Sequence, residues 1–251
     1  LGDDKFSEMM IKRFLNENLN VSLIKKINEK YPGLYSIHTD NEGNRSFSYW
    51  RDQSAAKLMM NELIDKDRLK TLNDCELFYY SGISAIILEK KIEKKLIDLA
   101  SKAKITAFDF NYRKNLHTNI KAAQILFKEI NELVNINFVS YDDILDVYGK
   151  TDPEEFVKNI SRKNNIILLR LQDHVIYSYY GKMGKVVVPI ITAKDKTAAG
   201  DSFNGSFLAN ETIDKNTNIE EKILKSHELT RAVIKHYGAI IPQSKMPKKV
   251  S

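Results

Sequence analysis

The chain has 251 residues, of which 43% are hydrophobic and 29% are charged, a composition that fits a globular protein with a sizeable core and excludes wholesale disorder. The single cysteine, Cys75, cannot form an internal disulfide, and no apolar run approaches the roughly 20 residues that span a bilayer. Charges interrupt the opening segment LGDDKFSEMM, which is unlike a signal peptide. We therefore expect a cytoplasmic protein with no membrane partner.

The formal net charge of +6 raises the question of nucleic-acid binding. The lysines alternate with glutamates and aspartates, as in EKKIEKKLIDLASKAK (89–104), and do not form a stripe. Interleaved charges are typical of solvated helix faces. An anionic small-molecule substrate or cofactor explains the positive surplus equally well, so we expect no nucleic-acid partner.

The first predicted elements are two strands, GLYSIHTD (33–40) and RSFSYWR (45–51), which flank the turn NEGN (41–44). Alternation along the second strand places Tyr49 and Arg51 on one face, together with Phe47. This hairpin lies outside the βαβ pattern of the remaining chain. It is either a small flap beside the main sheet or a structural edge hairpin, and the residues alone leave both possibilities open.

Short β-branched or aromatic runs then alternate with amphipathic helical patterns. The predicted strands are ELFYYSG (76–82), ITAFDFN (105–111), INFVS (136–140) and NIILLRL (165–171). The predicted helices cover 89–103, 118–134, 141–149 and 153–163, with one more after Asp201 and another over 219–237. This alternation is typical of a parallel sheet that is covered by helices on both faces. The runs VIYSYY (175–180) and KVVVPII (185–191), separated by GKMG, predict a hairpin at the sheet edge, where Pro189 is tolerated.

The stretch TAAGD (197–201) places small residues and a carboxylate directly before an apolar helical pattern. The first N–H groups of a helix are unpaired and partly positive, and small residues let a phosphate approach them closely. Asp201 then lies where it can accept a proton from an alcohol that attacks phosphorus. The alternative is that Asp201 is an ordinary helix N-cap, and this short motif alone leaves both interpretations open.

The longer stretch KDKTAAGDSFNGSFLA (194–209) resembles the second signature of the ribokinase-like (PfkB) carbohydrate kinases, D-T-x-A/G-A-G-D-x-F. Four other blocks agree with that family in order and spacing: GLYSIHTDNEGNRSFSYWR (33–51), YYSGIS (79–84), FDFNYRKNL (108–116) and HYGAIIP (236–242). The spelling TAAGDSF is similar to the 2-dehydro-3-deoxygluconate kinases within the family. The resemblance covers nearly the whole chain.

The resemblance implies an α/β fold, the ribokinase-like three-layer sandwich, with a mostly parallel sheet, helices on both faces and a small β-hairpin lid at 33–51. It implies one kinase domain over 1–251 that is incomplete at its N-terminus. Family members have a further N-terminal segment that carries the first core strand, part of the lid and glycine-rich motifs. We therefore expect either a piece of a longer protein or a naturally shorter relative.

The resemblance also implies an enzyme that uses ATP and Mg²⁺, with K⁺ as a further ion, to phosphorylate 2-dehydro-3-deoxy-D-gluconate to its 6-phosphate. Arg51 favours a sugar acid, because a guanidinium fork binds a carboxylate through two parallel hydrogen bonds. The alternatives are another ribokinase-type sugar kinase and a non-catalytic relative that only binds a ligand or a partner. A homodimer formed through the lid is implied as well.

By the same resemblance, Asp201 is the general base, and the backbone N–H groups of Ala198, Ala199, Gly200 and Asp201 form an anion hole. The implied substrate-binding residues are Tyr35, Tyr49, Arg51, Ile83, Arg113 and Asp201. The implied cofactor-binding residues are Asn111, Arg113, Ser140, Arg170, Asp173, Gly200, Gly238 and Ala239. Asp143 would orient magnesium through water, and Asp195 would help to hold a monovalent cation. Taken alone, Tyr35, Tyr49 and Arg51 fit a structural role better than a functional one.

Two residues near the expected nucleotide site depart from the family pattern. Leu171 stands where the family has a glycine, and a branched side chain there cannot adopt glycine's conformations and would crowd the nucleotide. Lys196 replaces a small residue or a threonine and adds a flexible cation near the phosphates. The first departure weakens the case for an efficient kinase and supports the non-catalytic alternative.

Overall fold

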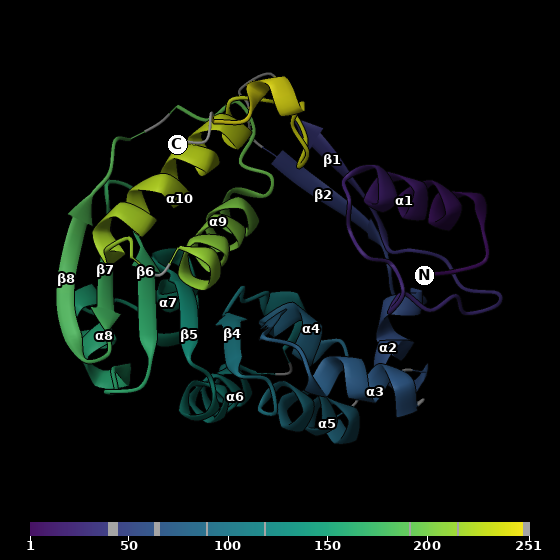
Figure 1. Cartoon of the computed structure of the whole chain (residues 1–251), viewed down its shortest axis with the longest axis horizontal. Coiled ribbons are helices and arrows are strands. Elements are labelled where there is room, and N and C mark those ends of the chain that lie inside the picture. Colours follow the sequence, from purple (N-terminus) through teal and green to yellow (C-terminus); the bar gives the residue numbers. More distant parts are fainter. Residues whose placement is uncertain are drawn as a thin grey trace. The chain divides into compact units, whose positions relative to one another are not determined.

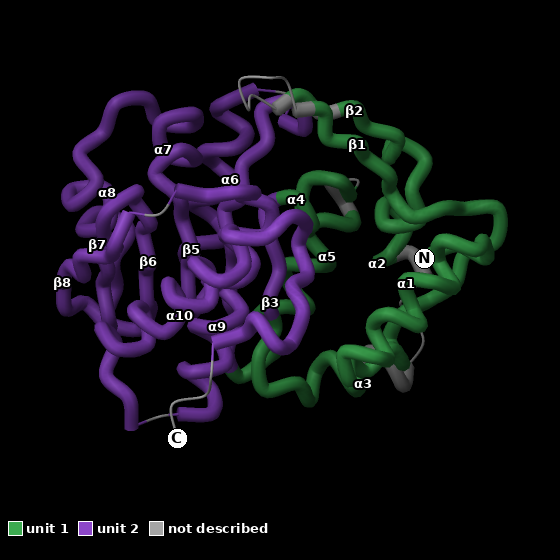
Figure 2. The backbone as a smooth tube through the Cα atoms, turned by 90° about the horizontal axis from the view of Figure 1, so that it is seen from above, with its two compact units in different colours: residues 1–78, 83–104 green, residues 79–82, 105–251 purple. Residues whose placement is uncertain are grey.

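The computed structural model describes residues 1–39, 45–62, 66–88, 90–117, 119–190, 192–214 and 216–247. The chain divides into two compact units, residues 1–78 with 83–104 and residues 79–82 with 105–251 (Figure 2). The chain passes from one unit to the other within strand β3 (Leu77–Ser81), at the start of helix α4 (Gly82–Ile86) and between Lys104 and Ile105. A single domain over the whole chain stays a prediction.

The first unit consists mainly of helices with one small antiparallel sheet (Figure 1). Its sheet is formed by β1 (Leu34–Thr39) and β2 (Arg45–Trp50), with Tyr35 opposite Tyr49. Its helices, besides most of α4, are α1 (Lys5–Asn16), η1 (Ala55–Leu58), α2 (Met59–Glu62), α3 (Lys66–Asn73) and α5 (Lys90–Ala100). The predicted hairpin is therefore present, while its turn at 41–44 lies outside the described residues.

Helix α1 was not predicted from the sequence. Asp4 caps it, because its carboxylate accepts hydrogen bonds from the N–H groups of Phe6 at 2.9 Å and Ser7 at 3.2 Å. An aspartate that precedes a mixed apolar and polar run is a normal helix start signal. The signal for this helix start is therefore present in the sequence.

The second unit is built on a sheet with the strand order β3-β4-β5-β6-β7-β8. Strands β4 (Ile105–Asp109), β5 (Ile136–Ser140) and β6 (Ile166–Arg170) are parallel, and β7 (His174–Tyr179) and β8 (Lys182–Val187) extend them in antiparallel fashion. The central strands are buried along most of their length, with Phe108, Phe138 and Leu168 fully inaccessible. Burial on both faces explains their continuous apolar sequences.

Helices cover both faces of this sheet and complete a three-layer arrangement (Figure 2). One face carries α6 (Ile120–Leu133), α7 (Tyr141–Tyr148) and α8 (Pro153–Ile160), and the other carries α9 (Ala199–Ile213) and α10 (Ile219–Ile234); two short 3₁₀ turns are η2 (Lys114–Leu116) and η3 (Gln243–Lys245). The predicted fold class, an α/β sandwich with a mostly parallel sheet and a small hairpin, is confirmed. Within the described ranges, no helix is at once long and apolar enough to cross a bilayer.

The hairpin between β7 and β8 corrects one prediction. Tyr180 and Gly181 have φ values of 51° and 85°, and two successive positive values close the hairpin with a two-residue turn. The expected GKMG loop is wrong, because Lys182, Met183 and Gly184 already belong to β8. Tight closure by the left-handed pair leaves these three residues free to pair with β7.

Candidate active site

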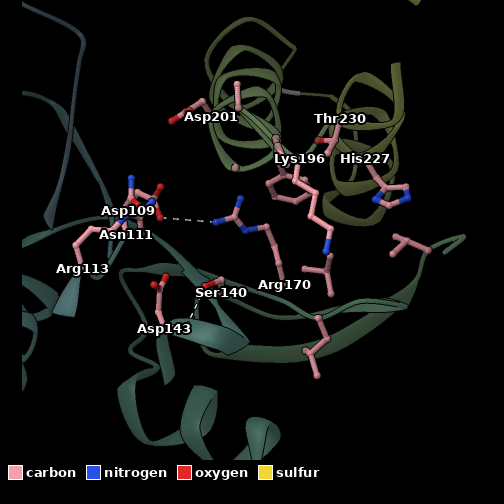
Figure 3. Close-up of a pocket in the computed structure, with 17 residues that line it drawn as sticks. Asp109, Asn111, Arg113, Ser140, Asp143, Arg170, Lys196, Asp201, His227 and Thr230 are labelled. Atoms are coloured by element: carbon pink, nitrogen blue, oxygen red, sulfur yellow. Dashed lines mark hydrogen bonds and ion pairs between the residues drawn. The ribbon is translucent and has the colours of Figure 1, made fainter. Parts of the chain in front are cut away.

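A cavity of about 400 Å³ in the second unit is lined by the carboxyl ends of three parallel strands and by the first turn of α9 (Figure 3). Asp109, Ser140 and Arg170 are the last residues of β4, β5 and β6, and all three line it. Parallel strands end at one edge of a sheet, which is where ligands bind in open α/β folds. The fold therefore brings together side chains that lie far apart in sequence.

The first turn of α9 differs from a capped helix start. Ala198 is the N-cap residue in a left-handed conformation with φ 59°, and no side chain caps the helix. Asp201 is the third residue of the helix, so the alternative that Asp201 is the N-cap is wrong. Its side chain is exposed and lines the cavity.

The backbone N–H groups of this turn are largely unpaired. The N–H of Ala199 donates to the carbonyl of Lys196 at 3.2 Å, and the N–H of Ser202 donates to the carbonyl of Ala198 at 2.9 Å. The N–H groups of Ala198, Gly200 and Asp201 make no hydrogen bond to any residue that the structure describes. Three of the four predicted anion-hole donors are therefore available, and the fourth is engaged in the turn.

Arg170 crosses the cavity from β6 toward Asp109, with α9 and Asp201 above it (Figure 3). Arg170 Nη2 lies 3.7 Å from Asp109 Oδ1, and Asp109 is only 3% exposed. Burial raises the pKa of Asp109 to about 6, although Arg170 opposes the shift, and the nearby carboxylates of Asp143 and Asp201 raise it further.

The residues that follow β4 also reach the cavity. Asn111 and Arg113 line it, as the resemblance implies. Asn111 has a positive φ of 39°, a conformation that asparagine tolerates better than most residues. Asp109 was not predicted, although its alternation with Asn111 and Arg113 in FDFNYR was a signal for a shared edge.

Ser140 and Asp143 form the acidic side of the cavity. Ser140 caps α7 by accepting the N–H of Asp143 at 3.1 Å, and Asp143 Oδ1 accepts the N–H of Tyr112 at 3.0 Å. Burial raises the pKa of Asp143, and hydrogen bonds to its carboxylate from Ser140 and from the Tyr112 N–H oppose the shift. Among the described residues, no three His, Cys, Asp or Glu side chains gather as ligands of a metal ion. The orientation of magnesium by Asp143 through water stays a prediction.

Asp195 joins two loops beside the cavity. Its Oδ1 accepts the Thr197 N–H at 2.8 Å and the Thr197 hydroxyl at 2.7 Å, and its Oδ2 accepts the Gly238 N–H at 2.9 Å. These hydrogen bonds give the carboxylate a structural role. A monovalent cation at Asp195 stays a prediction.

An adjoining cavity of about 630 Å³ continues the first one, and Arg170, Leu171, Lys196, His227 and Thr230 line both. The predicted residue Asp173 lines the second cavity, whereas Gly238 and Ala239 line neither. Leu171 has no positive φ, so the expected conflict with glycine's conformations is absent. Leu171 lines both cavities, and the expected crowding of a nucleotide by its side chain stays a prediction.

His227, Thr230 and Phe203 line the first cavity without having been predicted. His227 Nε2 lies 3.1 Å from the carbonyl oxygen of Pro189, and burial lowers the pKa of this histidine. A carbonyl oxygen can only accept, so the ring is the donor in this hydrogen bond. Helix α10 carries no motif that would single out His227 or Thr230, since their positions depend on how α10 packs against α9.

Four predicted substrate-binding residues belong to the first unit. Arg51 Cζ lies 4.3 Å from the centroid of the Tyr49 ring, and the rings of Tyr35 and Tyr49 are 6.2 Å apart. Tyr49 and Arg51 line a cavity of about 1040 Å³ within that unit. Ile83 lies in α4. Their assignment to the same substrate as Asp201 and Arg113 stays a prediction.

The amino-acid sequence matches known proteins over nearly its whole length. A family model described as pfkB family carbohydrate kinase matches residues 1–246. The 2-dehydro-3-deoxygluconokinase of Escherichia coli K12 is 32% identical over 98% of this chain and 82% of its own length. The protein of that name from Haemophilus influenzae is 31% identical over 96% of this chain and 79% of its own.

Solved structures share the fold. The 2-dehydro-3-deoxygluconokinase of Thermotoga maritima has a TM-score of 0.77 and 18% identity, covering 96% of this chain and 79% of that one. A ribokinase II candidate from E. coli in complex with ATP and Mg²⁺ has a TM-score of 0.77 and 18% identity, covering 95% of this chain and 76% of that one. A sugar kinase from Pyrococcus horikoshii in complex with ATP has a TM-score of 0.76 and 18% identity, covering 99% and 78%.

Proposed function

This chain belongs to the pfkB family of carbohydrate kinases, and we propose that it transfers the terminal phosphoryl group of ATP to the 6-hydroxyl of 2-dehydro-3-deoxy-D-gluconate. The products are the sugar-acid 6-phosphate and ADP. The observation that carries this proposal is the first turn of α9, where unpaired N–H groups and the exposed Asp201 carboxylate line one cavity. The names of the relatives in E. coli and H. influenzae support the choice of substrate.

The chemistry assigned to this turn follows from its charges. The N–H groups of Ala198, Gly200 and Asp201 stabilise the phosphoryl oxygens, because preorganised donors cost no reorganisation during the reaction. The Asp201 carboxylate accepts the proton of the attacking 6-hydroxyl. The oxygen–phosphorus bond to the substrate forms as the bond to ADP breaks, and the released ADP oxygen carries the negative charge away.

The nucleotide phosphates are assigned to the two adjoining cavities. Arg170 and Lys196 line both and supply positive charge for phosphate oxygens. A magnesium ion would neutralise part of the phosphate charge when bound, and Asp143 suits it through water. The E. coli and P. horikoshii structures in complex with ATP share this fold and support the assignment. We keep Asp195 as the residue for K⁺ and Gly238 with Ala239 for the adenine.

The sugar acid is assigned to the hairpin residues together with Arg113. Arg51 would bind the carboxylate as a fork, and Tyr35 and Tyr49 would donate to the sugar hydroxyls. The cation–π contact of Arg51 with Tyr49 supports this assignment because it holds the guanidinium in one orientation. Trp50, which is 61% exposed on the same hairpin, supports a homodimer through the lid.

A coupled ADP-release assay tests the proposal. The purified chain is given ATP, Mg²⁺ and a panel that contains 2-dehydro-3-deoxy-D-gluconate, other sugar acids and neutral sugars. Turnover that is fastest with 2-dehydro-3-deoxy-D-gluconate supports it, and ³¹P NMR of the product identifies the phosphorylated oxygen. Faster turnover with a neutral sugar would favour another ribokinase-type kinase. Absence of turnover together with a thermal shift by ATP would favour a non-catalytic relative.

A further inference from the structure

Resting on the proposed kinase function, we propose that Asp109 is a positioning residue that holds the Arg170 guanidinium against the first turn of α9, where it meets the transferred phosphoryl group. The partner chemistry is a phosphate anion. Asp109 itself acts only through Arg170.

The position of the Arg170 guanidinium is defined by three contacts in the second unit. Nη1 lies 3.0 Å from the point where a Cβ on Gly200 would stand, so the guanidinium fills the space that the glycine leaves open. Cζ lies 5.5 Å from the centroid of the Phe203 ring. Nη2 lies 3.7 Å from Asp109 Oδ1. The guanidinium is therefore held beside the unpaired N–H groups of α9.

The donors of this guanidinium remain free for a ligand. It makes no hydrogen bond to any residue within the described ranges, and its Nε is buried without a partner. Asp109 Oδ1 is also buried without a hydrogen bond, since 3.7 Å is too long for one but short enough for an ion pair. Asp109 thus attracts the guanidinium without occupying its N–H groups, and the planar fork suits phosphate oxygens.

The backbone of Asp109 is held in the sheet, and its side chain is buried. It ends the buried strand β4, where it is in register with Phe138 of β5. The groups that surround it are Tyr79 of β3 and Asn204 of α9, which hydrogen-bond each other at 3.1 Å, and the like charges of Asp143 on α7 and Asp201 on α9. Arg170 is the described cation within ion-pair distance. Because the Arg170 side chain is long and has several rotatable bonds, the anion at the end of β4 helps to fix the position of its guanidinium.

The direct test compares Asp109→Asn with Glu211→Gln. Both changes replace an acid of a buried ion pair by its amide, but Glu211 pairs with Lys222 between α9 and α10 and lines neither cavity. We expect Asp109→Asn to lower kcat on the order of 10- to 100-fold with KM for the sugar acid little changed, because a misplaced transition-state contact slows the chemical step. Glu211→Gln should retain kcat at temperatures well below its unfolding midpoint. Equal kcat losses in both variants would overturn the proposal.

A double-mutant cycle separates positioning from a general structural effect. If Asp109 acts through Arg170, Asp109→Asn has little further effect on kcat in an Arg170→Met background. A full 10- to 100-fold loss in that background would overturn the proposal. The kcat ratio of wild type to Asp109→Asn should also shrink as the pH falls below about 6, where Asp109 becomes neutral. A ratio that stays constant with pH would contradict it too.

Binding measurements keep this inference distinct from the proposed function. If wild type phosphorylates no sugar acid, the proposed function fails, while the Asp109–Arg170 pair is still tested by a non-hydrolysable ATP analogue that keeps the terminal phosphate. Calorimetry should then show weaker binding of the analogue for Arg170→Met, and in the Arg170→Met background Asp109→Asn should add no further loss. An additional loss of affinity for the analogue in that background would show that Asp109 acts independently of Arg170, which would overturn the proposal.

Discussion

The cavity of the second unit and the hairpin of the first unit carry their candidate residues in opposite ways. Asp109, Ser140 and Arg170 end buried parallel strands, so the register of the sheet fixes where each side chain begins. Tyr49 and Trp50 lie on a two-stranded sheet and are 47% and 61% exposed. The candidate residues of the second unit begin in a buried core, whereas those of the hairpin lie on an exposed surface.

This difference predicts that the two regions contribute differently to kcat and to KM. An isolated two-stranded hairpin is marginally stable, so we expect its exposed side chains to lose further freedom when a ligand covers them. Buried strand ends hold their side chains before any ligand arrives. We therefore expect changes in the second unit to reduce mainly kcat and changes in the hairpin to raise mainly KM.

The largest expected effect comes from Asp201→Asn. The amide cannot accept the hydroxyl proton, so kcat should fall by about 10³-fold while ATP still binds. A coupled assay measures kcat, and calorimetry measures ATP affinity. Asp214→Asn, at the opposite end of α9, is the control and should keep full activity. If Asp201→Asn kept most of its activity, the general-base assignment would be wrong.

Arg51→Ala comes next. Loss of the fork should raise KM for the sugar acid by about 100-fold with kcat little changed, because a charge-assisted pair contributes roughly 1.5–3 kcal/mol. Arg51→Lys, which keeps the charge but not the fork, should lie in between. Initial rates over a range of sugar-acid and neutral-sugar concentrations measure both constants. An equal loss with neutral sugars would show that Arg51 does not bind the substrate carboxylate. A fall in kcat with KM unchanged would contradict the expectation that changes in the hairpin act mainly on KM.

A smaller effect is expected from Gly200→Ala, measured against Gly205→Ala on the same helix. A Cβ at Gly200 would lie 3.0 Å from Arg170 Nη1, so the guanidinium must shift, and kcat should fall about 10-fold. A Cβ at Gly205 meets nothing within 4 Å, so Gly205→Ala should keep kcat and raise the free energy of unfolding by about 1 kcal/mol. Equal kcat values for the two variants would show that the position of the Arg170 guanidinium beside Gly200 does not affect the reaction.

The smallest expected effect is on stability. The pKa of Asp109 is about 6 in the folded protein and 3.8 without burial, so the folded state binds the proton more tightly. This group therefore raises the free energy of unfolding as the pH falls from 7 to 5, by about 1 kcal/mol. Asp109→Asn should lack that contribution, while the effect of Asp143 persists in both proteins. Urea unfolding at the two pH values measures the difference, and parallel pH profiles would show that Asp109 is not buried as a charge.

The sequence predicted the sheet better than the helices of the first unit. The strand at 136–140 coincides with β5, because a continuous apolar run between amphipathic helices leaves little ambiguity. The motif around Asp201 located the helix start and the cavity. Helix α1 was missed, and the start of β8 was placed too late because a left-handed conformation at Tyr180 is rare for a bulky residue.

The missed cavity residues share a physical cause. His227 and Thr230 reach the cavity only through the packing of α10 on α9, which no local motif encodes. The contact between Asp109 and Arg170 joins strands that are not adjacent in the sheet, and it depends on how a long side chain folds over β5. Local patterns locate strand ends, but they do not say which side chains meet across them.

The Asp195 carboxylate has a mechanical consequence. It fastens the backbone at Thr197, just before α9, to the backbone at Gly238, which lies 43 positions after Asp195 along the chain. A ligand that displaced the backbone at Gly238 would therefore also displace the residues that precede α9. Because one carboxylate holds both loops, we expect them to move together, with the coupling carried by the hydrogen bonds of the Asp195 side chain and not by the strands of the sheet.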